Sequence, residues 1–208
     1  MVHEPTLSEI RRALKLPRPG LRAQIQMAPY HRTSQDFLPS QRPREGGVLI
    51  LLYPIEGRLT LPLTRRTETV ADHKGQISLP GGAHEAGDES LEWTALRETE
   101  EELGVAPRSL EVLGALTALY IPLSGYRIYP YVASCPARPT FCPDPIEVAE
   151  LLEVPLATLL DPTARREEEW KLRGKSVRVP FFQVGVHKVW GATAMVLSEL
   201  ATLLREPE

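Results

Sequence analysis

Short apolar runs, bounded by glycine, proline or polar residues, recur along this chain and predict a series of strands. The expected strands cover residues 47–53, 59–66, 76–79, 110–120 and 128–134. A hairpin is expected over residues 170–182, with its turn at Gly174 and Lys175. Strands and helices are interspersed rather than strictly alternating, which favours a mixed sheet over a purely parallel one.

Three segments carry helix signals. Thr6 and Glu9 form a capping-box pattern before a helix expected to reach about Lys15. A second helix follows the Asp88–Ser90 cap and runs to about Leu103, where Gly104 ends it. A closing amphipathic helix is expected over Gly191–Arg205. Residues 146–152 are expected to form a short helix or turn, and a helical turn reaches residue 160.

The N-terminal part of the chain has a different composition. Five of the 20 prolines lie between Leu16 and Arg44, beside the polar run 31–36. This composition predicts an extended arm on the surface rather than a second core. We therefore expect a single domain at residues 47–208, with residues 1–46 forming a helix and an arm that pack on it.

Three glutamates of the second helix carry the candidate chemistry. Glu98, Glu101 and Glu102 have i, i+3 and i+4 spacing, so they share one helix face. Close carboxylates repel one another, and a hard divalent cation such as Mg²⁺ or Mn²⁺ removes that repulsion. The same run is also compatible with an ordinary solvated helix face. The tight turn at Gly81 and Gly82, just before the helix, favours the metal site.

In order, the glycine turn, Asp88, Arg97-Glu98, Glu101-Glu102 and Gly104-Val105 resemble the Nudix hydrolase box. Eight residues rather than the usual seven precede Arg97, and the first acid is Asp88 rather than glutamate. Both features resemble the coenzyme A diphosphatase subfamily. Further stretches similar to that subfamily are 63–67, 73–78, 124–130 and 190–194. Ala71 stands where the subfamily usually has arginine, and Leu79 replaces a common phenylalanine.

The resemblance implies an α/β/α sandwich around a mixed sheet. It also implies metal-dependent hydrolysis of a diphosphate, with coenzyme A or acyl-coenzyme A split into 3′,5′-ADP and 4′-phosphopantetheine. Divalent ions would neutralise charge on the phosphoryl oxygens and make a water more nucleophilic. The implied ligands are the side chains of Glu98, Glu101 and Glu102, with the Gly81 carbonyl as a backbone ligand.

Supporting roles follow for the neighbouring residues. Gly82 allows close approach at the turn, and Arg97 is expected to pair with Asp88. The general base is Glu147 or Glu98. Four basic residues are candidates for contacts with the substrate phosphates: Arg65, Arg66, His73 and Lys74. Solvated surface charges, or a structural histidine in the case of His73, would explain these four equally well.

Composition and charge limit the possible partners and the cellular location of the protein. A net charge of −3 argues against a nucleic-acid partner. No apolar run reaches the length of a membrane span, and no apolar signal region opens the chain, so we expect a cytoplasmic protein with free thiols at Cys135 and Cys142. The partner is a small nucleotide, and the resemblance allows a homodimer. Alternative functions are hydrolysis of ADP-ribose or a nucleoside triphosphate, and a non-catalytic nucleotide-binding regulatory module.

Overall fold

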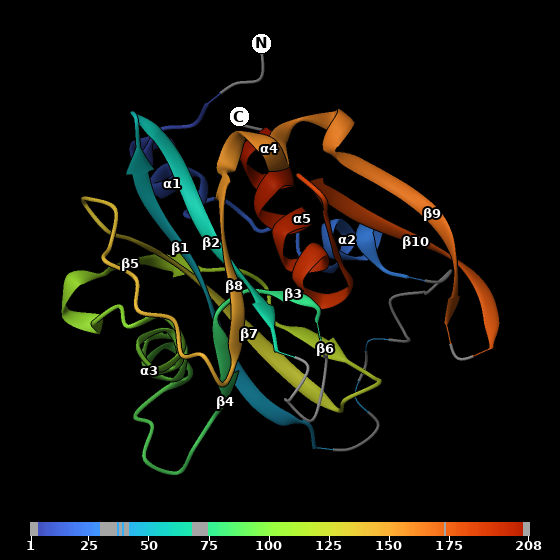
Figure 1. Cartoon of the computed structure of the whole chain (residues 1–208), viewed down its shortest axis with the longest axis horizontal. Helices are drawn as coiled ribbons and strands as arrows, with labels where there is room; N and C mark the ends of the chain where they lie inside the picture. The colour runs from blue at the N-terminus through green and yellow to red at the C-terminus, as the bar shows by residue number, and fades with distance from the viewer. Residues whose placement is uncertain are drawn as a thin grey trace.

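A mixed sheet forms the centre of the protein. The computed structural model describes residues 4–29, 37, 39, 42–67, 75–172 and 174–205. The strands of the main sheet are β1 (Arg44–Ile55), β2 (Arg58–Arg66), β3 (Ile77–Ser78), β4 (Gly81–Ala83), β5 (Glu111–Ala115), β6 (Leu119–Ile121), β7 (Tyr126–Ser134) and β8 (Val148–Pro155). Their main path is β3-β2-β1-β7-β5, with β4 on β1, β6 on β7 and β8 on β2. Figure 1 shows this arrangement.

The central strand β1 changes its partners along its length. It runs parallel to β7 over residues 44–52. Its other edge pairs with β4 around Val48 and with β2 around Tyr53, both antiparallel. The Leu49 amide, between these two regions, donates to the carbonyl of Pro80. The glycine turn is therefore held against the middle of the sheet by backbone hydrogen bonds.

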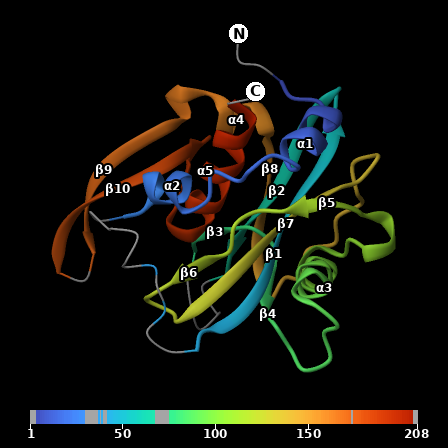
Figure 2. The same ribbon diagram turned by 180° about the vertical axis from the view of Figure 1, so that it is seen from behind.

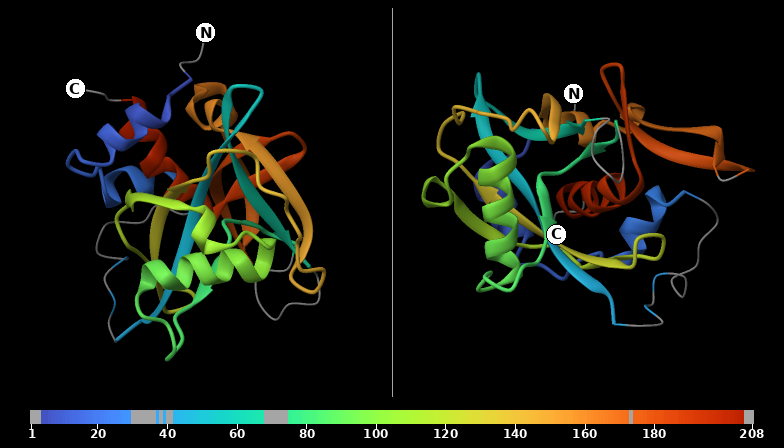
Figure 3. Two further views of the ribbon diagram at one scale, coloured as in Figure 1. Left: turned by 90° about the vertical axis from the view of Figure 1, so that its left-hand side faces the viewer. Right: turned by 60° about the horizontal axis from the view of Figure 1, so that its bottom comes forward.

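Helices cover both faces of this sheet. The helices are α1 (Leu7–Ala13), α2 (Leu21–Gln24), α3 (Leu91–Leu103), α4 (Leu156–Leu160) and α5 (Gly191–Arg205), with short 3-10 turns η1 (Ile25–Met27), η3 (Pro107–Ser109) and η4 (Pro162–Ala164). Figure 3 shows α3 on one side of the sheet and α5 on the other, and Figure 2 shows α1 and α2 beside α5. This layering confirms the expected α/β/α fold.

Alternation along β1 divides the core between the two faces. Leu49 and Leu51 pack with Ala95 of α3, whereas Ile50 and Leu52 pack with the α5 side. All four leucine and isoleucine side chains are fully buried. A strand buried on both sides explains why this stretch of sequence is apolar without alternation.

A second, three-stranded sheet lies beside α5. It consists of β9 (Arg165–Leu172), β10 (Lys175–Val184) and β11 (His187–Trp190), in the order β11-β10-β9. Trp170 stacks on Phe181 and meets Trp190 edge-on. The expected hairpin is confirmed and is longer than expected, because β9 begins in the charged run at Arg165.

Two expectations about elements need correction. The short helix or turn expected over residues 146–152 is confirmed as a turn at residues 146–147 and is wrong beyond them, because Val148–Pro155 forms β8 and pairs with β2. The single strand expected over residues 110–120 is instead β5 and β6, separated by a break. Both cysteines are free, as expected. In the described part of the chain, no helix is long and apolar enough to span a membrane.

The N-terminal segment is joined to α5 by a buried polar network. Glu199 of α5 is fully buried and accepts hydrogen bonds from the amides of Gly20 and Thr117 and from the side chain of Gln24. The Thr117 hydroxyl donates to the same carboxylate at 2.6 Å. Since β1 begins at Arg44, a single strand crosses the boundary expected at residue 46. Placing the boundary between arm and domain at that residue stays a prediction.

We predict that Glu199→Ala lowers the free energy of unfolding by about 3 kcal/mol, because it leaves several buried donors without an acceptor. Thr202→Ala in the same helix is the control, since it removes only a hydroxyl that donates to the Ser198 carbonyl. Thr202→Ala should lower the free energy of unfolding by about 1 kcal/mol or less. Urea unfolding measures both. Equal losses in the two variants would contradict a specific role for the Glu199 network.

Candidate functional site

The glycine turn leaves no room for side chains. A Cβ at Gly82 would lie 2.4 Å from Cδ of Glu98, and one at Gly81 would lie 2.3 Å from the carbonyl oxygen of Gly47. Gly81 also has φ of 146°, which L-residues rarely adopt. The turn therefore packs directly against α3, and the Glu98 carboxylate lies against its backbone.

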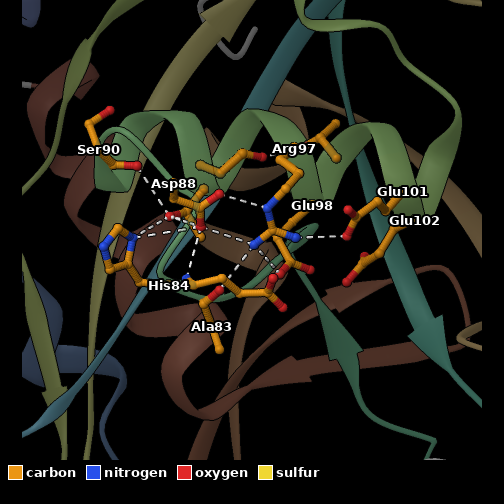
Figure 4. Close-up of polar contacts among 12 residues, drawn as sticks. Ala83, His84, Asp88, Ser90, Arg97, Glu98, Glu101 and Glu102 are labelled. Carbon is orange, nitrogen blue, oxygen red and sulfur yellow. Dashed lines mark hydrogen bonds and ion pairs between the residues drawn. The ribbon is translucent and has the colours of Figure 1, made fainter.

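Arg97 of α3 is fixed by the loop that follows the turn. Its Nε donates to Oδ1 of Asp88 at 2.8 Å, and its Nη2 donates to Oδ2 of Asp88 and to the Ala83 carbonyl, each at 3.1 Å. The Asp88 side chain is only 2% exposed. Hydrogen bonds from the Arg97 guanidinium hold the pKa of Asp88 well below its usual range. The expected Asp88–Arg97 pair is thus present (Figure 4).

The same guanidinium contacts two of the candidate metal ligands. Arg97 Nη2 donates to Glu98 at 3.0 Å, and Nη1 donates to Glu101 at 2.8 Å. Figure 4 shows these carboxylates turned toward Arg97. Burial raises the pKa of Glu98, and the charge of Arg97 offsets part of that rise. Glu101 is well exposed.

Glu102 has a different environment. Its side chain is 4% exposed, and the described residues offer no hydrogen-bond partner to its buried Oε2. Among the residues that the structure describes, Arg66 is the cation paired with it, with Nη1 3.8 Å from Oε1. Burial raises the pKa of Glu102 to about 8, with partial compensation from Arg66 and a further rise from Glu147 and Glu98. Glu102 is thus a buried carboxylate with too little positive charge around it.

The loop before β8 brings Glu147 to this cluster. The Asp144 amide donates to the Glu102 carbonyl at 2.9 Å, which fixes the loop on the end of α3. Asp144 Oδ1 accepts from the Ile146 amide, and the Thr67 hydroxyl donates to the Ile146 carbonyl. Glu147 Oε2 then lies 3.6 Å from Nη2 of Arg66.

The candidate phosphate contacts separate into three groups. Arg66 lies among the carboxylates of Glu102 and Glu147. Arg65 points elsewhere, with its Nε 2.8 Å from Glu150, which also lies 3.3 Å from His187. A register shift between Arg65 and Arg66 accompanies this divergence. His73 and Lys74 lie outside the described residues.

The donor set fits a divalent cation, although its side chains are not arranged around one. Among the described residues, no three His, Cys, Asp or Glu side chains are grouped to hold a metal ion. The cause is visible in the geometry, because Glu98 and Glu101 are paired with Arg97. Glu102 supplies the positive argument, since its buried Oε2 has no partner and its charge is poorly compensated. Carboxylate oxygens are the hard ligands that Mg²⁺ and Mn²⁺ prefer.

Two residues that sequence reasoning missed support Asp88. The Thr94 hydroxyl donates to Asp88 Oδ2 at 2.8 Å, and Nδ1 of His84 lies 2.9 Å from that hydroxyl. Thr94 is fully buried on α3. Its place on the face that packs against the sheet was a usable signal, because a buried hydroxyl needs a partner. Nothing in the sequence singled out His84.

Comparisons with known proteins agree with this geometry. A family model described as the NUDIX domain matches residues 43–173. The chain is 35% identical over 182 residues to the "uncharacterized Nudix hydrolase NudL" of Pectobacterium atrosepticum, covering 86% of this chain and 90% of that protein. A NudL of Photorhabdus laumondii is 38% identical over 142 residues, covering 68% and 75%. The solved structure of a MutT/nudix family protein from Enterococcus faecalis matches with a TM-score of 0.52 at 16% identity, covering 98% of this chain and 76% of that one, and so supports the fold.

We predict that Asp88→Asn lowers the free energy of unfolding by about 3 kcal/mol at pH 7, because it leaves the half-buried Arg97 without its buried carboxylate partner. The folded-state pKa of Asp88 is depressed, so its contribution exists above the unfolded pKa of about 4 and is lost as pH falls below it. The difference in the free energy of unfolding between wild type and variant should therefore be smaller at pH 3. Urea unfolding at both pH values measures this. A gap independent of pH would contradict the charge pairing.

Glu102→Gln should make the metal-free protein more stable at alkaline pH. The folded-state pKa of Glu102 is raised to about 8, so ionisation costs stability progressively as pH rises from about 4.5 to 8. The variant removes this cost, and we expect its Tm at pH 9 to exceed that of the wild type by about 5 °C. At pH 4.5 the wild type and the variant should have the same Tm. Thermal melts in chelator give the comparison, and a destabilised variant at pH 9 would contradict it.

Proposed function

This chain belongs to the Nudix hydrolase family, and we propose that it is a divalent-metal-dependent diphosphatase whose preferred substrate is coenzyme A or an acyl-coenzyme A. The products would be 3′,5′-ADP and 4′-phosphopantetheine or its acyl form. The observation that carries the hydrolytic part is the buried, undercompensated carboxylate of Glu102 beside Glu98, Glu101 and Glu147. Hard divalent cations such as Mg²⁺ and Mn²⁺ prefer carboxylate-rich oxygen sites of this kind.

Each of these residues would have a distinct role in the hydrolysis. Glu98, Glu101 and Glu102, with the Gly81 carbonyl, would hold Mg²⁺ or Mn²⁺, which supplies charge neutralisation at the phosphates when bound. Glu147, on the loop fixed by Asp144, is our candidate for taking the proton of the attacking water; Glu98 is the alternative. Water would attack one phosphorus, and the anhydride P–O bond would break toward the other phosphate.

Coenzyme A specificity is supported by where the subfamily-like stretches lie. The stretch at 190–194 opens α5, and there the Thr193 hydroxyl donates to the Ile77 carbonyl of β3, which leads into the glycine turn. The stretch at 63–67 contains Arg66, beside Glu102. One stretch thus contacts the strand before the turn and the other contacts Glu102, and these contacts support the proposal of a shared substrate site.

Two alternatives remain open. Ala71 replaces an arginine that is usual in the subfamily, which favours ADP-ribose or a nucleoside triphosphate as the substrate. A non-catalytic nucleotide-binding module is disfavoured because the candidate carboxylates Glu98, Glu101 and Glu102 are all present. A homodimer and a cytoplasmic location also stay proposals.

The decisive experiment is hydrolysis of coenzyme A, 3′-dephospho-coenzyme A and ADP-ribose in Mg²⁺, in Mn²⁺ and in chelator, with the products identified by mass. We expect coenzyme A to have the highest kcat/KM, above 3′-dephospho-coenzyme A by about tenfold, because a 3′-phosphate adds charge-assisted hydrogen bonds. Activity should vanish in chelator. Glu102→Gln tests the metal site in a variant that we expect to fold, and it should lower kcat by about a thousandfold or more.

Each outcome has a distinct meaning. A higher kcat/KM for ADP-ribose than for coenzyme A would reject the subfamily assignment and leave the metal-dependent diphosphatase intact. Full activity in chelator, or wild-type turnover by Glu102→Gln at saturating metal, would reject the metal site itself.

A further inference from the structure

Two arginines share the acidic residues of the site, and they are held very differently. Arg97 makes contacts of 2.8–3.1 Å to Asp88, Glu98, Glu101 and the Ala83 carbonyl. In the described part of the chain, the side-chain ion pairs of Arg66 are long, 3.8 Å to Glu102 and 3.6 Å to Glu147. Distances of this length are ion pairs without hydrogen bonds. Arg97 is therefore fixed by its surroundings, whereas Arg66 is held mainly by charge.

Arg66 also has an unused donor. Its Nε is buried and has no partner among the described residues. Oε2 of Glu102, the carboxylate that pairs with Arg66 through its other oxygen, is also buried and has no partner in the described part of the chain. A buried donor and a buried acceptor that stay unpaired each cost free energy. Both costs are relieved if a cation reaches Glu102 and an anion reaches Arg66.

The position of Arg66 makes these two events interdependent. A divalent cation bound to Glu102 would neutralise the negative charge that attracts the Arg66 guanidinium. The cation would also repel Arg66 at short range. A diphosphate beside the cation would offer acceptors in the planar arrangement that a guanidinium fits. Among the described residues, Arg66 is the cation paired with both Glu102 and Glu147 in the absence of these ligands.

We propose that Arg66 couples cation binding to diphosphate binding: it neutralises Glu102 and Glu147 in the ligand-free protein and passes to the diphosphate when a cation takes those carboxylates. This role rests on the proposed function and goes beyond it, because it makes Arg66 a competitor of the cation when no substrate is present. The cation alone then binds weakly, and each ligand strengthens the binding of the other by the same factor.

The test is calorimetric titration of the full chain with Mg²⁺ alone, and with Mg²⁺ in the presence of α,β-methylene-ADP, a diphosphate whose bridge is not hydrolysed. Magnesium bound by the nucleotide in solution is measured without protein and subtracted. Wild type, Arg66→Ala and Arg66→Lys are compared. Arg178→Ala is the control: it removes one arginine charge, from the exposed pair with Glu167 on the β9–β10 hairpin. Circular dichroism confirms that each variant is folded.

In the wild type, the diphosphate should tighten Mg²⁺ binding by about tenfold. Arg66→Ala should bind Mg²⁺ alone about fivefold more tightly than the wild type, since the competing charge is gone, and its coupling should fall below about threefold. Arg66→Lys should keep wild-type affinity for Mg²⁺ alone but show weaker coupling, because it lacks the planar fork. Arg178→Ala should match the wild type.

Failure of this inference can be told apart from failure of the proposed function. If the wild type hydrolyses coenzyme A with Mg²⁺ while Arg66→Ala retains wild-type Mg²⁺ affinity and full coupling, the coupling role of Arg66 is overturned and the diphosphatase stands. If the wild type binds no Mg²⁺ with or without the diphosphate, the proposed function is overturned together with it.

Discussion

The buried contact between Asp88 and Arg97 is the interaction on which the site depends. It joins the loop after the glycine turn to the middle of α3, and the Ala83 carbonyl adds a third contact to the same guanidinium. Asp88 holds Nε and Nη2 of Arg97, and from this position Nη2 also donates to Glu98 while Nη1 donates to Glu101. The position of the acidic helix face relative to the turn is thus set by one side chain. A lysine could not make this set of contacts, since it lacks the planar fork.

Close approach of backbones is the second requirement. A Cβ at Gly47 would lie 2.4 Å from the carbonyl oxygen of Leu91, so α3 packs on β1 at a distance that only glycine permits. The same holds at Gly82, where Glu98 occupies the space of a side chain. The Glu98 carboxylate therefore lies directly on the backbone of the turn. The low exposure of Glu102 and its raised pKa follow from this packing.

Local signals predicted the elements that carry the chemistry. The cap at Ser90 and the left-handed Gly104 bound α3 as expected, and α5 has the expected limits. Elements that depend on partners far away in the sequence were harder to predict. Residues 148–155 form a strand because β2 offers them an edge, and β9 is strongly polar until Trp170, so its pairing with β10 has no local signature.

Within the site, the sequence indicated which residue types meet but not how their charges are shared. Spacing placed the three glutamates on one helix face, and the pairing of Asp88 with Arg97 followed from the family resemblance. Strand alternation predicts that Arg65 and Arg66 point to opposite faces of β2, but it does not show which carboxylates each would meet. The loop at Asp144, which brings Glu147 to Arg66, is likewise fixed by a backbone contact with the end of α3.

The buried network around Glu199 has a consequence for the biosynthesis of the protein. Gln24 and Gly20 emerge from the ribosome early, yet their partner lies 175 and 179 residues further along the chain. The core on that face of the sheet is completed by α5, so the emerging chain exposes Leu52 and Ile50 until the last helix is released. During translation the sheet is thus covered on the α3 side first. This interval of one-sided exposure is when the nascent chain most needs a chaperone.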